Sequence, residues 1–122
     1  MPWTCRLLSA AEVARKANAE GLEIGDMWYA PERRNKATLS RQYLRDWADK
    51  RDPIKIVLPG PGATIWCVDW RERKDGQWLP DGWTVTGTPP RITVTPSVDL
   101  TRGGKYPGRW HGWIRDGVLT AG

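Results

Sequence analysis

The stretch Ile54-Lys55-Ile56-Val57-Leu58-Pro59-Gly60-Pro61-Gly62 shows most clearly which kind of fold the sequence encodes. Its first five residues alternate apolar side chains with a period of two, and the proline and glycine run that follows predicts a turn. Residues 63–70 are rich in β-branched and aromatic side chains and predict a second strand. The two strands predict a hairpin, and the periodicity changes from helical to strand-like at Pro53.

Strand patterns continue toward the C-terminus. After a polar turn at residues 74–76, three segments repeat the pattern: residues 82–87, 91–98 and 109–120. The last of these contains Asp116-Gly117, a sequence typical of a tight type I′ turn, and is expected to fold back on itself.

The residues before Pro53 have helical signals. Ser9-Ala10-Ala11-Glu12 has the pattern of a capping box and predicts a helix over residues 10–20, which Gly21 ends. Ser40 is expected to cap a second helix, which Asp52-Pro53 terminates.

These patterns predict an α+β fold in a single domain of residues 1–122. Residues 1–52 are expected to be mainly helical, apart from an extended segment at residues 25–31. Residues 53–122 are expected to form the sheet. In this arrangement two N-terminal helices pack on an antiparallel sheet of about five or six strands.

The composition excludes several classes of protein. The 122 residues include nine Trp, three Tyr and no Phe, and the net charge is +5. Nothing in the sequence matches the length of a membrane span, so we expect a soluble intracellular protein. Cys5 and Cys67 are too few for a disulfide scaffold, and the positive charge excludes an acidic mimic of DNA.

The single histidine, His111, is the first candidate for catalysis. An imidazole can accept a proton from an adjacent thiol or hydroxyl and so produce a nucleophile at neutral pH. The candidate nucleophiles are the thiol of Cys67 and the hydroxyls of Ser97, Thr95 and Thr93. A pair of this kind predicts a small Cys/His or His/hydroxyl hydrolase.

Other catalytic and metal-binding patterns are weak or absent. The phosphate-binding loop, dinucleotide, serine-hydrolase elbow and metalloprotease motifs do not occur. A zinc site would need His111, Cys67 and Cys5 with added carboxylates such as Asp69, Asp99 or Asp116. We therefore predict no metal and no cofactor. Asp69, Glu72 and Asp75 are interpreted as solvated charges around a strand end.

A basic and aromatic stretch is the most suggestive binding feature. Residues 101–115 contain four basic side chains and no acidic one, interleaved with aromatic rings and glycines. Such a loop can hold phosphate groups and stack a base, although it can also be an ordinary connection between strands. The predicted ligand-binding residues are Arg102, Lys105, Tyr106, Arg109, Trp110, His111 and Trp113.

Two threonine-lined strands form a further candidate pocket. Thr84 and Thr86 alternate in one strand, and Thr93 and Thr95 alternate in the next. If these strands lie beside the one that carries His111, they form a small polar pocket. Pro96 predicts an interruption in its strand, at a sheet edge or a bulge.

Several segments resemble a family of small uncharacterised proteins encoded by tailed bacteriophages and prophages. The most specific are Thr95-Pro96-Ser97-Val98 and the segment from His111 to Leu119, a T-P-S-[IV] pattern followed by H-G-W-[IL]-x-D-G. The other segments are Gly25–Glu32, Arg45–Trp47, Val57–Gly60, Cys67–Asp69, Gly82–Gly87 and Ile92–Val94.

The resemblance implies a phage-encoded protein that acts in the cytoplasm of an infected bacterial host. It gives no activity and no functional residues. Together with the basic stretch, it favours a non-enzymatic accessory protein that binds an anionic nucleotide, a nucleic acid or a host protein such as a defence protein. The small hydrolase is the alternative.

Overall fold

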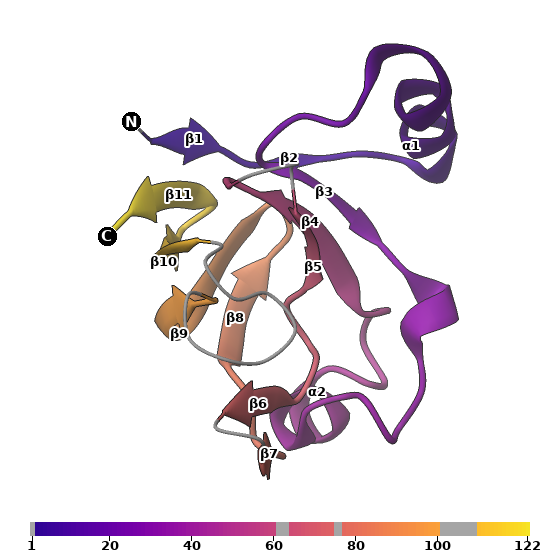
Figure 1. The fold of residues 1–122 in the computed structure, drawn as a ribbon. Coiled ribbons are helices and arrows are strands. Elements are labelled where there is room, and N and C mark those ends of the chain that lie inside the picture. Colours follow the sequence, from indigo (N-terminus) through magenta and orange to yellow (C-terminus); the bar gives the residue numbers. More distant parts are fainter. Residues whose placement is uncertain (1, 61–63, 75–76, 101–109) are drawn as a thin grey trace.

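The computed structural model describes residues 2–60, 64–74, 77–100 and 110–122. Within these ranges the chain forms three sheets (Figure 1). The five-stranded sheet has the order β1-β11-β10-β9-β8 and consists of β1 (Trp3–Thr4), β8 (Thr84–Thr88), β9 (Arg91–Asp99), β10 (His111–Arg115) and β11 (Val118–Ala121). The four-stranded sheet has the order β2-β3-β4-β5 and consists of β2 (Arg6–Leu7), β3 (Asp26–Tyr29), β4 (Ile54–Leu58) and β5 (Thr64–Cys67).

The remaining elements are short. The hairpin of β6 (Glu72–Lys74) and β7 (Gln77–Leu79) forms the third sheet. The helices are α1 (Ala10–Arg15), the π-helical turn η1 (Lys16–Glu20) that follows it, the 3-10 turn η2 (Pro31–Arg33) and α2 (Arg41–Asp46).

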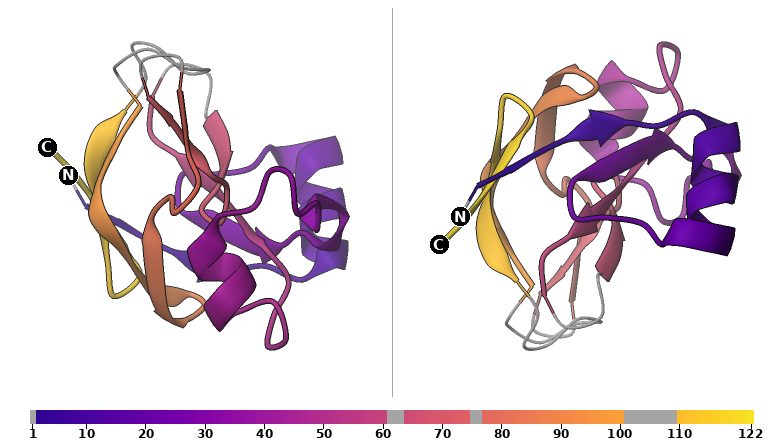
Figure 2. Two further views of the ribbon diagram at one scale, coloured as in Figure 1. Left: turned by 90° about the horizontal axis from the view of Figure 1, so that it is seen from below. Right: turned by 90° about the horizontal axis from the view of Figure 1, so that it is seen from above.

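One hydrophobic core is shared by the two larger sheets. Met27, Ile54 and Ile56 contribute from the four-stranded sheet, and Val94 and Ile114 contribute from the five-stranded sheet. Figure 2 shows the β9–β11 strands on one side of the molecule and α1 on the other. The outer face of the five-stranded sheet therefore points away from α1.

The prediction of two N-terminal helices packed on one antiparallel sheet is wrong. The structure is mostly sheet, and the N-terminal part supplies β1, β2 and β3 to two different sheets. β2 pairs with β3 in parallel, and α2 has only six residues. The physical reason is that α1 has no buried residue, so the apolar surface of each sheet is covered mainly by the other sheet.

Several local predictions are confirmed. Ser9 and Glu12 form the capping box of α1, and the Ser40 hydroxyl accepts a hydrogen bond from the Tyr43 N–H at the start of α2. β4 and β5 form the predicted hairpin. β10 and β11 are joined at Asp116 and Gly117, which have φ values of 46° and 74°, as a type I′ turn requires.

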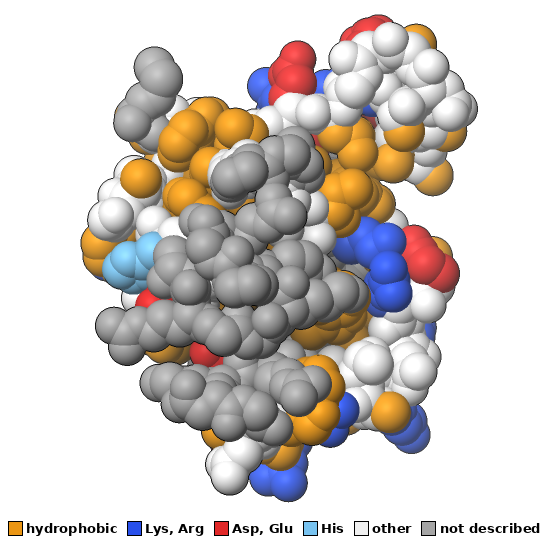
Figure 3. Space-filling model, viewed as in Figure 1, with side chains coloured by type: hydrophobic (Ala, Val, Ile, Leu, Met, Phe, Trp, Pro, Cys, Tyr) orange, Lys and Arg blue, Asp and Glu red, His pale blue; other side chains and the backbone are white. Residues whose placement is uncertain are grey.

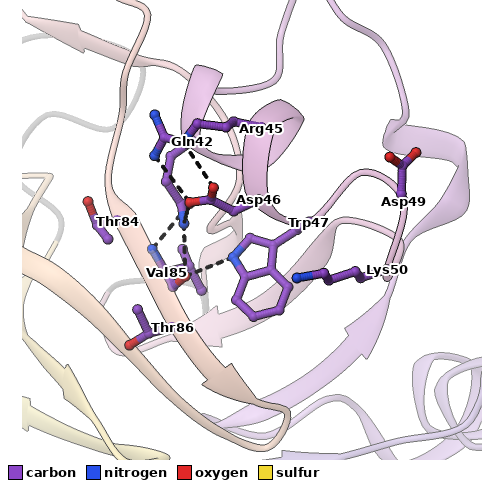
Figure 4. Close-up of a pocket in the computed structure, with 9 residues that line it drawn as sticks. All are labelled: Gln42, Arg45, Asp46, Trp47, Asp49, Lys50, Thr84, Val85 and Thr86. Atoms are coloured by element: carbon purple, nitrogen blue, oxygen red, sulfur yellow. Dashed lines mark hydrogen bonds and ion pairs between the residues drawn. The ribbon is translucent and has the colours of Figure 1, made fainter.

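β8 is an edge strand of the five-stranded sheet, and side chains from α2 and from the residue after it cover part of this edge (Figure 4). The Gln42 amide donates to the Val85 carbonyl at 3.0 Å and accepts from the Val85 N–H at 3.3 Å. The Trp47 indole N–H donates to the same carbonyl at 2.8 Å. Gln42 thus makes the two contacts that a neighbouring strand would make at this position.

Asp69 is buried, so its interpretation as a solvated charge is wrong. Its carboxylate binds the Arg51 guanidinium with two contacts, at 2.8 and 3.1 Å, and accepts the Ile54 N–H at 2.9 Å. Arg51 also lies 4.8 Å from the centre of the Trp47 ring. This buried ion pair connects the segment after α2 to β4 and to the end of β5.

Candidate active site

The single histidine lies on the outer face of the five-stranded sheet. In β10, Gly112 and Ile114 are buried, and the strand alternation therefore directs His111, Trp113 and Arg115 to the opposite face. None of the described helices lies over this face (Figure 2). The histidine side chain, pale blue in Figure 3, reaches the molecular surface.

The two threonine-lined strands belong to the same sheet as the histidine strand. β9 lies directly beside β10, as predicted, whereas β8 lies on the far side of β9. Thr93 and Thr95 line the pocket beside Ser97, and Thr84 and Thr86 do not. Thr84 is opposite Thr95, and Thr86 is opposite Thr93. The outer face of the sheet consequently presents hydroxyl groups next to His111.

A bulge in β9 sets the position of Ser97. Gly112 of β10 pairs with Val98 of β9. Two residues later, Ile114 pairs with Val94, so β9 has two extra residues in this interval. They belong to Thr95-Pro96-Ser97, where the proline has no N–H to donate to a ladder. The predicted interruption is thus a bulge, a feature that can redirect a side chain.

Ser97 and His111 are hydrogen-bonding neighbours. The Ser97 Oγ lies 3.3 Å from the His111 Nε2. The Trp83 indole N–H lies 3.4 Å from the Ser97 carbonyl and supports the bulge from the core side. Of the three hydroxyls considered with His111 in the sequence, the Ser97 hydroxyl is the one that this hydrogen bond joins to it. A serine hydroxyl beside an imidazole has the geometry of a nucleophile and its general base.

Asp99 is the cross-strand neighbour of His111. It lies directly opposite His111 in the ladder between β9 and β10. Residues paired in this way have Cβ atoms about 4.5–5.5 Å apart and share one face of the sheet. The sequence suggested Asp99 only as a possible metal ligand, because the strand register that pairs it with His111 is not a local property of the sequence.

The imidazole also lies close to Trp113 and Gly122. The ring centres of His111 and Trp113 are 5.6 Å apart. A Cβ placed on Gly122 would lie 2.8 Å from the Trp113 ring and 3.1 Å from the His111 Cε1. The missing side chain of Gly122 therefore leaves room for both rings.

An open pocket adjoins the Ser97 hydroxyl. Its volume is about 380 Å³, and it extends along β9 and β10 away from His111. The residues that line it are Thr93, Val94, Thr95, Pro96, Ser97, Trp113 and Arg115. A substrate segment in this pocket would lie next to the hydroxyl.

Cys67 is not brought to His111. It belongs to β5, in the four-stranded sheet, whereas His111 belongs to the five-stranded sheet. Its side chain is fully buried, and burial together with the negative charge of Asp69 raises the pKa of Cys67 to about 12. The thiol is therefore protonated at neutral pH, and the structure gives no support to a Cys/His nucleophilic pair.

We expect Cys67 to resist alkylation in the folded protein. The thiolate is the reactive form, and a pKa near 12 leaves only about one thiol in 10⁴ ionised at pH 8. Treatment with iodoacetamide, followed by peptide mass spectrometry, should show modification of Cys67 at least about 10³-fold slower than in 6 M guanidinium. Rapid modification of Cys67 in the folded protein would contradict this assignment.

The predicted anion-binding residues are only partly described. Arg102, Lys105, Tyr106 and Arg109 lie outside the described residues. Trp110 is buried in the core, where its ring is not available to stack on a ligand. His111 and Trp113 lie on the outer face beside Ser97.

The described residues offer neither a cluster of metal ligands nor a helix that could span a membrane. Among the described residues, no group of three or more His, Cys, Asp or Glu side chains is arranged to hold a metal ion. The helices found in the same part of the chain are all too short or too polar to cross a bilayer.

Comparison with known proteins identifies a family. A family model described as "Bacterial ubiquitination-like system serine protease (BubE)" matches residues 44–121. No curated protein and no solved structure matches the chain. The description concerns an enzyme of a bacterial system, so the prediction of a non-enzymatic phage-encoded accessory protein that binds a ligand or a host protein is wrong. The match covers well over half of the sequence, and the chain belongs to the BubE family of bacterial ubiquitination-like system serine proteases.

Proposed function

We propose that this chain is a serine protease in which Ser97 is the nucleophile and His111 is the general base. The observation that carries the proposal is the 3.3 Å contact between the Ser97 Oγ and the His111 Nε2, at the end of an open pocket. The description of the family supports the same reaction class. Its name also suggests that the substrate is a protein of a bacterial ubiquitination-like system.

The reaction begins with acyl transfer to Ser97. The Ser97 Oγ attacks the carbonyl carbon of the scissile peptide bond while His111 Nε2 takes the hydroxyl proton. The resulting tetrahedral intermediate collapses, the C–N bond breaks, and the leaving amine takes the proton from His111. The product of this half-reaction is an ester between Ser97 and the acyl part of the substrate.

Hydrolysis of the ester regenerates the enzyme. His111 takes a proton from a water molecule, whose oxygen attacks the ester carbonyl, and then returns the proton to the Ser97 oxygen as the C–O bond breaks. Both steps require the unprotonated Nε2 of His111 to face Ser97, and hence a proton on Nδ1. Asp99, opposite His111 in the ladder, is suited to accept a hydrogen bond from that Nδ1–H and to hold the tautomer.

We also place this activity in the bacterial cytoplasm. Cys5 and Cys67 are both free and buried, and unpaired thiols are typical of proteins in reducing compartments.

An alkyl fluorophosphonate probe tests the nucleophile without knowledge of the substrate. The activated Ser97 oxygen displaces fluoride from phosphorus and forms a covalent adduct, which peptide mass spectrometry locates. We expect one adduct, on Ser97, which is lost in Ser97→Ala and forms at least about 10²-fold more slowly in His111→Ala.

Ser9→Ala is a matched control, because Ser9 is an exposed cap of α1 outside the candidate site. This variant should be labelled at the wild-type rate. A folded wild-type protein that carries no adduct on Ser97, or one labelled equally on Ser9, would refute the proposed nucleophile.

A further inference from the structure

The pocket beside Ser97 has a cationic end. Arg115 is exposed, and its guanidinium lies 5.3 Å from the centre of the Trp113 ring, on the side of the sheet that carries His111. Among the residues that the structure describes, Arg115 forms no ion pair. The neighbouring carboxylate of Asp116 is 3.8 Å from Arg91 instead. Arg115 thus presents a positive charge to the pocket, and the Trp113 ring supports its guanidinium plane.

The hydroxyl groups of the pocket add hydrogen-bond donors. Thr93 Oγ1 accepts the Asp116 N–H at 2.9 Å. A hydroxyl that accepts through its lone pair still has one proton to donate. Thr95 contributes a second hydroxyl to the same pocket. An arginine side chain has only donors, so the group that best satisfies this end of the pocket is an acceptor with negative charge.

The distance from Ser97 limits where that acceptor lies in a substrate. Thr93 is four residues before Ser97 in β9, which corresponds to about 13 Å in a fully extended strand. The bulge at residues 95–97 shortens this path, and the Arg115 guanidinium turns back over Trp113. An extended peptide bound to the sheet would therefore bring a group two or three residues from its scissile bond to Arg115.

From this arrangement we infer that the pocket is a specificity site for a carboxylate two or three residues from the scissile bond. The inference rests on the proposed protease function, since Ser97 defines the point from which the position is counted. Arg115 is the specificity-determining residue, with Thr93 and Thr95 as secondary donors. The carboxylate belongs either to an acidic side chain or to the C-terminus of the substrate.

A positional peptide library provides the cleavage test. At each position around the cleavage site, peptides carry Asp, Asn or Lys, and each is made with a free or an amidated C-terminus. For the wild-type protein we expect kcat/KM to be about tenfold higher for Asp than for Asn at one position two or three residues from the cut. If the C-terminus of the substrate supplies the carboxylate, kcat/KM is instead higher for the peptide with a free C-terminus than for the same peptide with an amidated C-terminus.

Substitutions at Arg115 identify the cause of that preference. Arg115→Glu should reverse it, so that the Lys peptide is cleaved faster than the Asp peptide. Arg41→Glu is the matched control and should leave the preference unchanged, because Arg41 is an exposed arginine on α2 beside Asp81 and does not line the pocket. A wild-type preference below about twofold at every position, or an Arg115→Glu variant that slows all peptides equally, would overturn the inference.

A binding test separates this inference from the protease proposal. Ser97→Ala is titrated with N-acetyl-Ala-Asp-Ala-amide, its Asn counterpart, and N-acetyl-tri-alanine as acid and amide. The signals followed by NMR are the Trp113 indole N–H and the Arg115 Nε–H. We expect both signals to shift with a carboxylate peptide only, and we expect no shift of the Trp113 indole N–H in Arg115→Glu. If these shifts occur but the wild type cleaves no peptide, the carboxylate site is supported and the protease proposal fails. If the shifts do not occur, the carboxylate site is refuted.

Discussion

Replacing either Ser97 or His111 with alanine is expected to reduce kcat by at least about 10⁴-fold. The two side chains act in one proton transfer, so removing the second after the first should cost little more. The double variant is therefore expected to retain the same residual rate as either single variant, within about tenfold. The measurement is the initial rate of hydrolysis of the best-cleaved peptide in a mixed library.

Thr86→Ala controls for the loss of a hydroxyl from the same sheet. Thr86 is exposed on β8 and does not line the pocket beside Ser97. This variant should keep at least half of the wild-type rate. Two results would contradict the proposed pair: a His111→Ala variant with a tenth or more of the wild-type rate, or single losses that multiply in the double variant. Circular dichroism spectra that match the wild type exclude unfolding as the cause of inactivity.

Local features of the fold were predictable because they depend on a few adjacent residues. The Asp116-Gly117 turn requires positive φ at two positions, and the sequence supplies the residue types that tolerate it. The capping box at Ser9 is equally local. The two-residue strands β1 and β2 have no period that a sequence pattern can reveal. The division of the strands between two sheets depends on packing between distant segments, and the expected single sheet is wrong for that reason.

The candidate site was predictable as a set of residue types but not as a geometry. His111 and Ser97 could both be named because an imidazole and a hydroxyl are chemically suited to each other. The choice of Ser97 over Thr95 and Thr93 depends on the bulge in β9, and the role suggested for Asp99 depends on the register between β9 and β10. Both are properties of strand pairing, which a single sequence does not specify.

The buried ion pair of Asp69 makes its removal the substitution with the largest expected effect on stability. Asp69 is fully buried, and the Arg51 side chain is only 7% exposed. Asp69→Ala would leave a buried guanidinium without its carboxylate and the Ile54 N–H without its acceptor. The expected loss in the free energy of unfolding is about 3–5 kcal/mol, measured by guanidinium chloride denaturation.

Asp81→Ala is the matched control for this stability measurement. The Asp81 side chain is 82% exposed and lies 4.0 Å from the guanidinium of Arg41, whose side chain is 70% exposed. Solvent and counterions screen such a pair, so this variant should lose no more than about 1 kcal/mol. Equal losses in the two variants would show that the Asp69 pair is not desolvated.

Replacing both members of the buried pair shows whether Asp69→Ala is unstable because it leaves the Arg51 charge buried without a partner. In Arg51→Met combined with Asp69→Leu, neither charge remains to be left unpaired, and the two apolar side chains approximate the lost volume. The double variant is therefore expected to recover most of the stability that Asp69→Ala loses. The reason is that the loss in the single variant comes mainly from the buried Arg51 guanidinium that has no carboxylate partner. A double variant as unstable as Asp69→Ala would instead assign the stability to the hydrogen bond between Asp69 and the Ile54 N–H.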